Sequence, residues 1–293
     1  MGRGIVILSH KRPDSVKTLK ALRRLGYDGP FVIVVDDKDP TLSRYKELYP
    51  DNLFIFSKAA IAKEIDVMDQ GGTDKVVLFA RQAAWYAAEE FGFDEFLELD
   101  DDYEWFAFVR TPEGRFHAKG LTVARLPATQ VFNAYWDALA SMPPRVLTIA
   151  ISQTGDYMHK RQDVPWSFPR NRLRKAMNAF FLRLDRRFDW IGRFNEDVNA
   201  YVYLGGLGWV FLTHPYVVLG QEDTQTGKGG MTEAYAKVGT YQKSFYTVML
   251  RPDAVAISVM GMDHHRLHHR IDWDLAVPKI IRPVEHNQEV NDG

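Results

Sequence analysis

Short apolar runs alternate with amphipathic stretches over the first hundred residues. Residues 16–25 place apolar side chains at helical spacing, and 76–91 carries alanine and aromatic residues on one side. Between these predicted helices lie short runs rich in β-branched and aromatic residues. The predicted strands are 5–8, 31–35, 53–56 and 96–99. Alternating strands and helices are typical of βαβ units, so we predict an α/β fold with a largely parallel sheet.

Acidic residues directly follow two of these predicted strands. Asp36 and Asp37 end the second strand, and Asp100, Asp101 and Asp102 end the fourth. Open α/β sheets bind ligands beyond the carboxyl ends of their strands, so this placement predicts a nucleotide-type site. No Gly-x-Gly-x-x-Gly follows the first strand and no phosphate-loop motif occurs, which argues against nicotinamide enzymes and P-loop NTPases.

The three consecutive aspartates predict a cation site. Side chains alternate along an extended segment, so Asp100 and Asp102 share a face and Asp101 points the other way. Like charges this close raise each other's pKa or recruit a metal, and Mg²⁺ or Mn²⁺ prefers such oxygen ligands. A solvated acidic turn is the alternative. The preceding strand and the neighbouring aromatic residues favour the metal.

Overall composition narrows the chemistry. The 293 residues include 37 Lys and Arg against 38 Asp and Glu, a formal net charge of −1, and no cysteine. Without cysteine there is no disulfide framework, thiolate zinc site, iron–sulfur cluster or Cys nucleophile, so a metal must sit on oxygen or imidazole. No apolar run reaches the length of a membrane helix or a signal-peptide core, and we expect a cytoplasmic protein without a membrane partner.

The strand ending in Asp-x-Asp, the helix containing Ala80-Arg81-Gln82 and the aspartates after the second strand resemble the nucleotide-sugar-binding half of GT-A glycosyltransferases. The resemblance implies a Rossmann-like mixed sheet flanked by helices. It implies one domain over 1–270, with a nucleotide-sugar-binding half (1–110) and an acceptor half (111–270), and a C-terminal tail (271–293). It also implies that Mn²⁺ or Mg²⁺ bridges the donor diphosphate.

The same resemblance assigns residues to a donor such as UDP-glucose. The loop Ser9–Arg12 would lie beside uracil and ribose, Asp37 or Asp36 would contact the base or ribose, and Arg81 would help hold the donor. The glycine-rich segment 221–231 is either a lid over the donor, with Lys228 at its tip, or a plain surface connection. The expected donor-binding residues are Ser9, His10, Arg12, Asp36, Asp37, Arg81, Asp101, Lys228 and Arg266.

Glu196 and Asp197 stand at the head of a predicted helix and look like the Glu-Asp motif that inverting members use for the acceptor. A helix N-terminus keeps a carboxylate ionised, which suits a general base. A simple helix cap is the alternative for Asn195 or Asp197. We assign Asp197 as the base and Glu196 as an acceptor or backbone contact, while inversion or retention stays open.

Four of the nine histidines fall within 261–270. GT-A enzymes often supply a last metal or diphosphate ligand from this region, so the resemblance implies His264 or His265 as a metal ligand. Arg266 and Arg270 could neutralise diphosphate oxygens. An exposed polar turn is the alternative, and adjacent imidazoles without thiolate partners argue against tetrahedral zinc.

Charge is unevenly distributed along the chain. Residues 159–188 hold nine Lys or Arg against two Asp, a local charge of +7, with interleaved aromatic residues that include Phe180 and Phe181. Such a segment favours a polyanionic partner whose bases stack on the aromatic rings, although a solvated helix face is the alternative. The candidate DNA-binding residues are Lys160, Arg161, Arg170, Arg172, Arg174 and Lys175.

The opening Leu-Ser-His-Lys-Arg-Pro-Asp and the central Glu-Leu-Asp-Asp-Asp-Tyr resemble the phage TET-associated glycosyltransferases, in pattern and order over 4–270. This resemblance implies sugar transfer from a UDP-sugar to the hydroxymethyl group of 5-hydroxymethylcytosine in DNA. Alternatives are a GT-A enzyme acting on a glycan, lipid or protein, and a non-catalytic phage DNA-binding protein. A nucleotidyltransferase would need a glycine-rich activating loop, which 9–14 lacks.

Overall fold

The computed structural model describes residues 1–68, 74–108, 127–153, 179–221, 243–260 and 266–276. All four predicted strands are confirmed. They are β1 (Arg3–Leu8), β2 (Phe31–Asp36), β3 (Leu53–Phe56) and β4 (Glu95–Asp100). The two predicted helices are present as α1 (Lys17–Arg24) and α4 (Leu78–Glu90), and the shorter α2 (Leu42–Leu48) and α3 (Lys58–Ile61) flank β3 in sequence.

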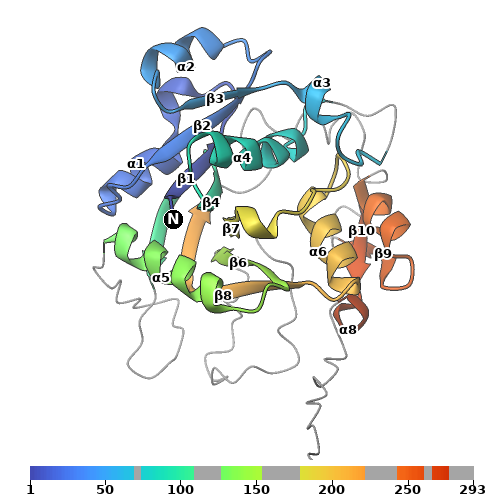
Figure 1. Cartoon of the computed structure of the whole chain (residues 1–293). Coiled ribbons are helices and arrows are strands. Elements are labelled where there is room, and N and C mark those ends of the chain that lie inside the picture. The colour runs from blue at the N-terminus through green and yellow to red at the C-terminus, as the bar shows by residue number, and fades with distance from the viewer. Residues whose placement is uncertain (69–73, 109–126, 154–178, 222–242, 261–265, 277–293) are drawn as a thin grey trace, which may run out of the picture.

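Within the described residues, eight strands form one mixed sheet in the order β3-β2-β1-β4-β7-β6-β8-β5 (Figure 1). The later strands are β5 (Tyr103–Phe108), β6 (Val146–Gln153), β7 (Phe180–Arg183) and β8 (Val210–Gln221). The first four strands pair in parallel, β7 lies antiparallel between β4 and β6, and β5 lies antiparallel to β8. The halves before and after residue 110 therefore share one sheet.

Helices cover both faces of this sheet. One face carries α1, α2 and α5 (Ala128–Ser141). The other carries α4, α6 (Glu196–Gly206), the helix at 243–250 and α8 (Trp273–Ala276). A separate hairpin of β9 (Val255–Met260) and β10 (Arg266–Ile271) lies beside α6 (Figure 1). This three-layer arrangement confirms the predicted α/β fold with a mixed sheet flanked by helices.

The central strands read as continuous apolar runs because both of their faces are buried. In β1, Val6 and Leu8 pack toward α4, whereas Ile5 and Ile7 pack toward α1 and α5. Alternate side chains thus enter different cores, as the period of two in a strand requires. This burial fixes the strand register and hence the position of the residues that follow each strand.

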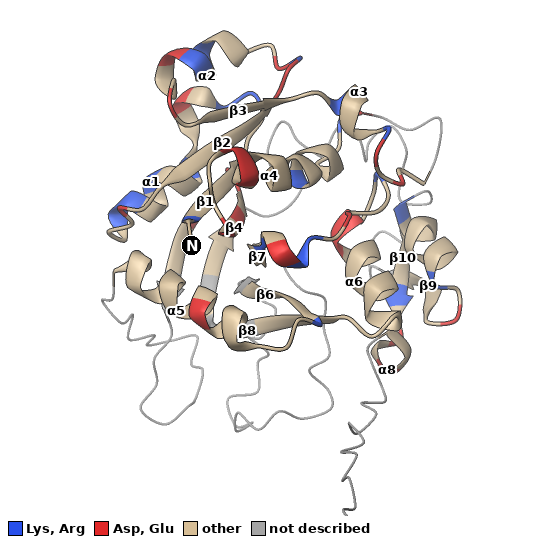
Figure 2. Ribbon diagram, viewed as in Figure 1, with Lys and Arg blue, Asp and Glu red and all other residues tan. Residues whose placement is uncertain are grey.

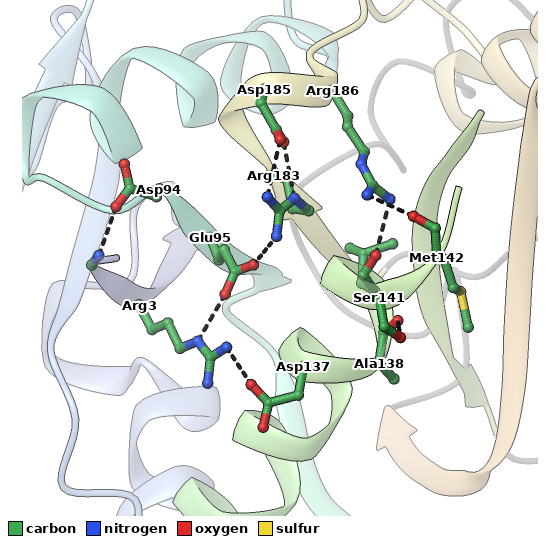
Figure 3. Close-up of polar contacts among 12 residues, drawn as sticks. Arg3, Asp94, Glu95, Asp137, Ala138, Ser141, Met142, Arg183, Asp185 and Arg186 are labelled. Atoms are coloured by element: carbon green, nitrogen blue, oxygen red, sulfur yellow. Dashed lines mark hydrogen bonds and ion pairs between the residues drawn. The ribbon is translucent and has the colours of Figure 1, made fainter. Parts of the chain in front are cut away.

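A polar network ties the amino ends of β1 and β4 to the carboxyl end of antiparallel β7 (Figure 3). Arg3 Nε donates to Glu95 Oε2 at 2.8 Å and Arg3 Nη2 reaches Asp137 Oδ1 on α5 at 2.6 Å, while Arg183 pairs with Glu95 from the other side. Arg186 donates to the carbonyl oxygens of Leu139, Val146 and Met142, which satisfies the end of α5. This network lies at the end of β4 opposite Asp100.

The chain after β10 continues into the core. Trp273 stacks on Tyr201 of α6 with ring centroids 5.8 Å apart, and Ala276 is buried. None of the helices in the described ranges has the length and hydropathy needed to cross a membrane.

Candidate functional site

The turn after β4 is held in place by the start of α1. Thr18 Oγ1 donates to the carbonyl oxygen of Asp100 at 2.6 Å and accepts the backbone N–H of Tyr103 at 2.9 Å. The backbone N–H of Thr18 also donates to the carbonyl oxygen of Asp101 at 3.2 Å. Three hydrogen bonds made by the buried Thr18 therefore fix the backbone conformation of residues 100–103.

Asp101 links the turn after β4 to the loop after β1. Its carboxylate accepts a hydrogen bond from Ser9 Oγ at 2.6 Å and another from Arg12 Nη1 at 3.0 Å. Tyr45 completes this group, since its hydroxyl lies 2.7 Å from Ser9 Oγ and accepts the backbone N–H of Arg12 at 3.0 Å. Three predicted donor-binding residues, Ser9, Arg12 and Asp101, thus lie together, and they bind one another.

The predicted base-and-ribose side of the site lies at the end of β2. Asp36 is buried and pairs with Lys58 Nζ at 2.7 Å, whereas Asp37 is exposed. His10 Nδ1 lies 2.7 Å from Asp39 Oδ2. Burial lowers the pKa of His10 despite the nearby Asp39 carboxylate, so at neutral pH the imidazole is uncharged and donates from Nδ1. Its half-exposed ring leaves Nε2 as a hydrogen-bond acceptor for a ligand.

Arg81 on α4 brings together carboxylates from distant parts of the sequence. Its Nη1 donates to Glu98 Oε1 at 2.5 Å, its Nε donates to Glu196 Oε1 at 2.9 Å, and its Nη2 lies 3.5 Å from Asp100 Oδ1. The Arg81 side chain is 1% exposed. The structure therefore places the end of β4 beside the start of α6, where acidic residues mark the first turn (Figure 2).

The segment before α6 adopts a conformation that side-chain amides support. Asn195 has a left-handed backbone, with φ of 56°, and makes no capping bond to α6. Its Nδ2 instead donates to the carbonyl oxygen of Lys243 at 2.7 Å. Asn199 Nδ2 donates to the carbonyl oxygens of Ile191 and Phe194, both at 2.9 Å. Glu196 and Asp197 thus begin α6 from a fixed loop, and the cap alternative does not hold for Asn195.

Burial and mutual repulsion disfavour the charged forms of the carboxylates at this site. Burial raises the pKa of Glu98 to about 8, with Asp100 and Glu196 adding to the shift. Burial likewise raises the pKa of Asp100 to about 7, helped by Asp102 and Asp101, and that of Asp101 to about 6. Burial and the adjacent Asp197 raise the pKa of Glu196. A cation bound here would relieve this repulsion.

The oxygen atoms of Asp100 and Asp102 fit a hard divalent cation. Asp100 Oδ1 is buried and makes no hydrogen bond within the described residues, although Asp100 itself is one-fifth exposed. Asp102 is about one-quarter exposed, with Arg12 Nη1 at 3.7 Å from its Oδ2. No group of three or more His, Cys, Asp or Glu in the described ranges is arranged to hold a metal. Mg²⁺ and Mn²⁺ bind one or two carboxylates and keep other positions for phosphate and water, so these two aspartates are the residues that would hold such a cation.

Comparison with known protein families identifies the family to which this chain belongs. The sequence model of the TET-Associated Glycosyltransferase family matches residues 4–230. The chain belongs to this family. It is therefore a glycosyltransferase, as the family resemblance predicted. No curated protein gives a significant match to the sequence.

Two solved structures show distant similarity to this TET-associated glycosyltransferase. The mannosyltransferase PcManGT from Pyrobaculum calidifontis matches at 14% identity and a TM-score of 0.42, over 77% of this chain and 58% of that one. Glucosyl-3-phosphoglycerate synthase from Mycobacterium tuberculosis matches at 10% identity and a TM-score of 0.45, over 92% of this chain and 87% of that one. With TM-scores below 0.5, these similarities carry no argument about donor, metal or acceptor.

Several predicted residues of this TET-associated glycosyltransferase lie outside the described structure. For Arg266 the structure describes the strand β10 but not the side chain, while Arg270 is exposed on the same strand. The predicted residues outside the described ranges are Lys228, His264, His265 and all six DNA-binding candidates, Lys160, Arg161, Arg170, Arg172, Arg174 and Lys175.

One part of the predicted DNA-binding segment is wrong. Phe180 and Phe181 are fully buried in β7 and pack against Trp190 and Tyr135, so neither ring is available to stack on a base. Arg183, which contributed to the local charge of +7, is bonded within the fold to Glu95. The apolar run around β7 belongs to the hydrophobic core. The charge of Arg183 stabilises the fold through its contact with Glu95.

Sequence reasoning missed two residues that build this glycosyltransferase site. Glu98 lies inside the apolar run of β4. An ionisable residue in a strand predicted to be buried indicates that a charged partner is buried with it, and this could have been read from the sequence. Thr18 gave no such signal, because only the fold brings α1 to the turn after β4.

Proposed function

We propose that this TET-associated glycosyltransferase transfers a sugar from a UDP-sugar to the hydroxymethyl oxygen of 5-hydroxymethylcytosine in DNA. The main structural support for this proposal is that the Arg81 guanidinium contacts both Asp100 and Glu196. The proposed metal-side and acceptor-side carboxylates therefore lie at a single centre. The family resemblance and the basic residues between 160 and 175 in the sequence support this acceptor.

The proposed reaction assigns a separate task to each group. Asp197, in the first turn of α6 where free amide groups favour a carboxylate, accepts the proton of the hydroxymethyl group. The oxygen forms a bond to the anomeric carbon as the bond from that carbon to the diphosphate oxygen breaks, and UDP leaves. Mn²⁺ or Mg²⁺ held by Asp100 and Asp102 would neutralise the departing diphosphate.

Glu196 is the less suitable base of the pair. Its Oε1 already accepts a hydrogen bond from Arg81, which ties this carboxyl group to the buried guanidinium. With Asp197 taking the proton on the side of α6 opposite the diphosphate, the hydroxymethyl oxygen would attack from that side and the configuration at the anomeric carbon would invert.

The decisive experiment incubates the protein with Mn²⁺, a panel of labelled nucleotide sugars, and matched duplexes containing cytosine or 5-hydroxymethylcytosine. We expect label only in the hydroxymethylated duplex and only with a UDP-sugar. Label on a glycan, lipid or protein, with none on either duplex, would assign the alternative acceptor class and reject DNA.

Two substitutions test the assigned roles. Asp102→Asn should abolish metal-dependent hydrolysis of free donor, and Asp197→Asn should abolish transfer while donor binding persists. Asp51→Asn, on an exposed turn before β3, is the matched control and should retain both activities. Full transfer by Asp197→Asn would remove that residue from the proposed mechanism.

A further inference from the structure

The Arg81 guanidinium lies wholly inside the protein, beside two aromatic rings that pack against each other. Its Cζ is 5.8 Å from the centroid of Phe180 and 5.7 Å from that of Trp190. The residue is 1% exposed, and its nitrogen atoms face the carboxylates of Glu98, Glu196 and Asp100. A donor diphosphate could reach this group only by displacing those contacts, so the environment does not fit the donor-binding role that the family resemblance implies.

These contacts join two elements that lie far apart in the sequence. Glu98 and Asp100 are two residues apart on β4, so both side chains point to the face covered by α4. Glu196 is the first residue of α6 and is 115 residues from Arg81 in the chain. The planar guanidinium donates from Nη1 to β4 and from Nε to α6, which fixes the spacing between the two elements.

We propose that Arg81, anchored by Glu98, is a positioning residue that sets Asp197 of α6 relative to Asp100 of β4. The proposal rests on the proposed roles of Asp100 and Asp197. Glu196 is then the tether of α6, and its oxygen serves as a hydrogen-bond acceptor for Arg81. A shift of about 1 Å between reacting groups is enough to reduce turnover by about 100-fold, so a small loss of register between β4 and α6 has a large kinetic effect.

The first test is Arg81→Lys, which keeps the positive charge but loses the planar fork. We expect kcat for sugar transfer to fall by about 100-fold while the Kd of UDP in the presence of Mn²⁺, measured by calorimetry, stays the same within error. The matched control is Arg187→Lys, because Arg187 is exposed and stacks over Tyr86 at 4.3 Å. If Arg81→Lys weakens UDP binding as much as it lowers kcat, Arg81 is a donor ligand and the proposal is wrong.

A second pair of variants keeps the test valid if Arg81→Lys fails to fold. Glu196→Gln retains an oxygen that accepts from Arg81 Nε, whereas Glu196→Ala retains none. We expect Glu196→Ala to have a lower kcat than wild type. We expect the kcat of Glu196→Gln to be at least about tenfold higher than that of Glu196→Ala, which corresponds to one hydrogen bond. Equal inactivity of the two variants would overturn the tether, since it would show that the charge of Glu196 is what matters.

Failure of the proposed function gives a different result. If wild-type protein glycosylates an acceptor other than DNA, the same kcat and Kd comparison is made with that acceptor and still decides the role of Arg81. If Asp197→Asn transfers sugar normally while Arg81→Lys does not, the base assignment fails and the positioning of Asp197 fails with it.

Discussion

Replacing Glu98 with Gln tests whether burial holds a proton on this residue in the folded protein. Glu98 is fully buried, its Oε1 accepts from Arg81, and its Oε2 has no hydrogen-bond partner among the described residues. Burial raises its pKa from 4.5 to about 8. Glutamine keeps a carbonyl oxygen for Arg81 and has nearly the same shape, so the substitution chiefly removes the titration.

The sign and size of the effect follow from linkage. Between pH 4.5 and about 8, the folded protein holds a proton at Glu98 that the unfolded chain has released. The free energy of unfolding therefore falls as pH rises through this window, by about 1.4 kcal/mol per pH unit. From pH 5 to pH 8 the contribution reaches about 4 kcal/mol as an upper bound, and Glu98→Gln lacks it.

The assay is urea denaturation of both proteins at several pH values from 5 to 8, in the presence of a chelator and followed by tryptophan fluorescence. We expect the free energy of unfolding of Glu98→Gln to increase relative to that of wild type as pH rises. Glu90→Gln, at the exposed end of α4, should track wild type. If the free energies of unfolding of wild type and Glu98→Gln changed in parallel with pH over the whole range, Glu98 would not hold this proton in the folded protein.

Three further substitutions test other contacts. Thr18→Val removes the hydroxyl that holds the turn after β4, and we expect Mn²⁺ binding, measured by calorimetry, to weaken about tenfold; an unchanged Kd would contradict this. Arg186→Met removes the side-chain donor shared by three carbonyl oxygens, of which that of Leu139 still accepts the Met142 N–H, and should cost about 2–4 kcal/mol in urea unfolding while kcat per folded molecule persists. Gly4→Ala would place a Cβ 2.4 Å from the ring of Phe93, so we expect a loss of about 1–3 kcal/mol, and a stability equal to wild type would show that the ring moves freely.

Local pattern was sufficient for the first half of the fold. The apolar runs of β1, β2, β3 and β4 lie one after another with helices between them, so their pairing follows from chain order and handedness. The aspartates at the ends of β2 and β4 could be placed for the same reason. The start of α6 was also readable, because Glu196 and Asp197 sit at a helix boundary.

The rest depended on contacts between distant segments. Antiparallel β7 inserts between β4 and β6, and no local pattern says which neighbours a four-residue strand will take. The position of Arg81 was similarly hidden: an arginine on a helix is usually exposed, and only the approach of α6 and β4 encloses it. The roles of Phe180 and Phe181 were misjudged because core aromatics and base-stacking aromatics look alike in sequence.

The interleaved strand order has a consequence for how the chain folds as it is synthesised. One edge of β4 has no partner until β7, at residues 180–183, has emerged from the ribosome, and β5 waits for β8 at 210–221. An unpaired strand edge is a site for aggregation, and pairing between distant segments is slow. We therefore expect a fragment ending near residue 110 to be insoluble on its own, and a nascent chain to depend on chaperones until about two hundred residues have been made.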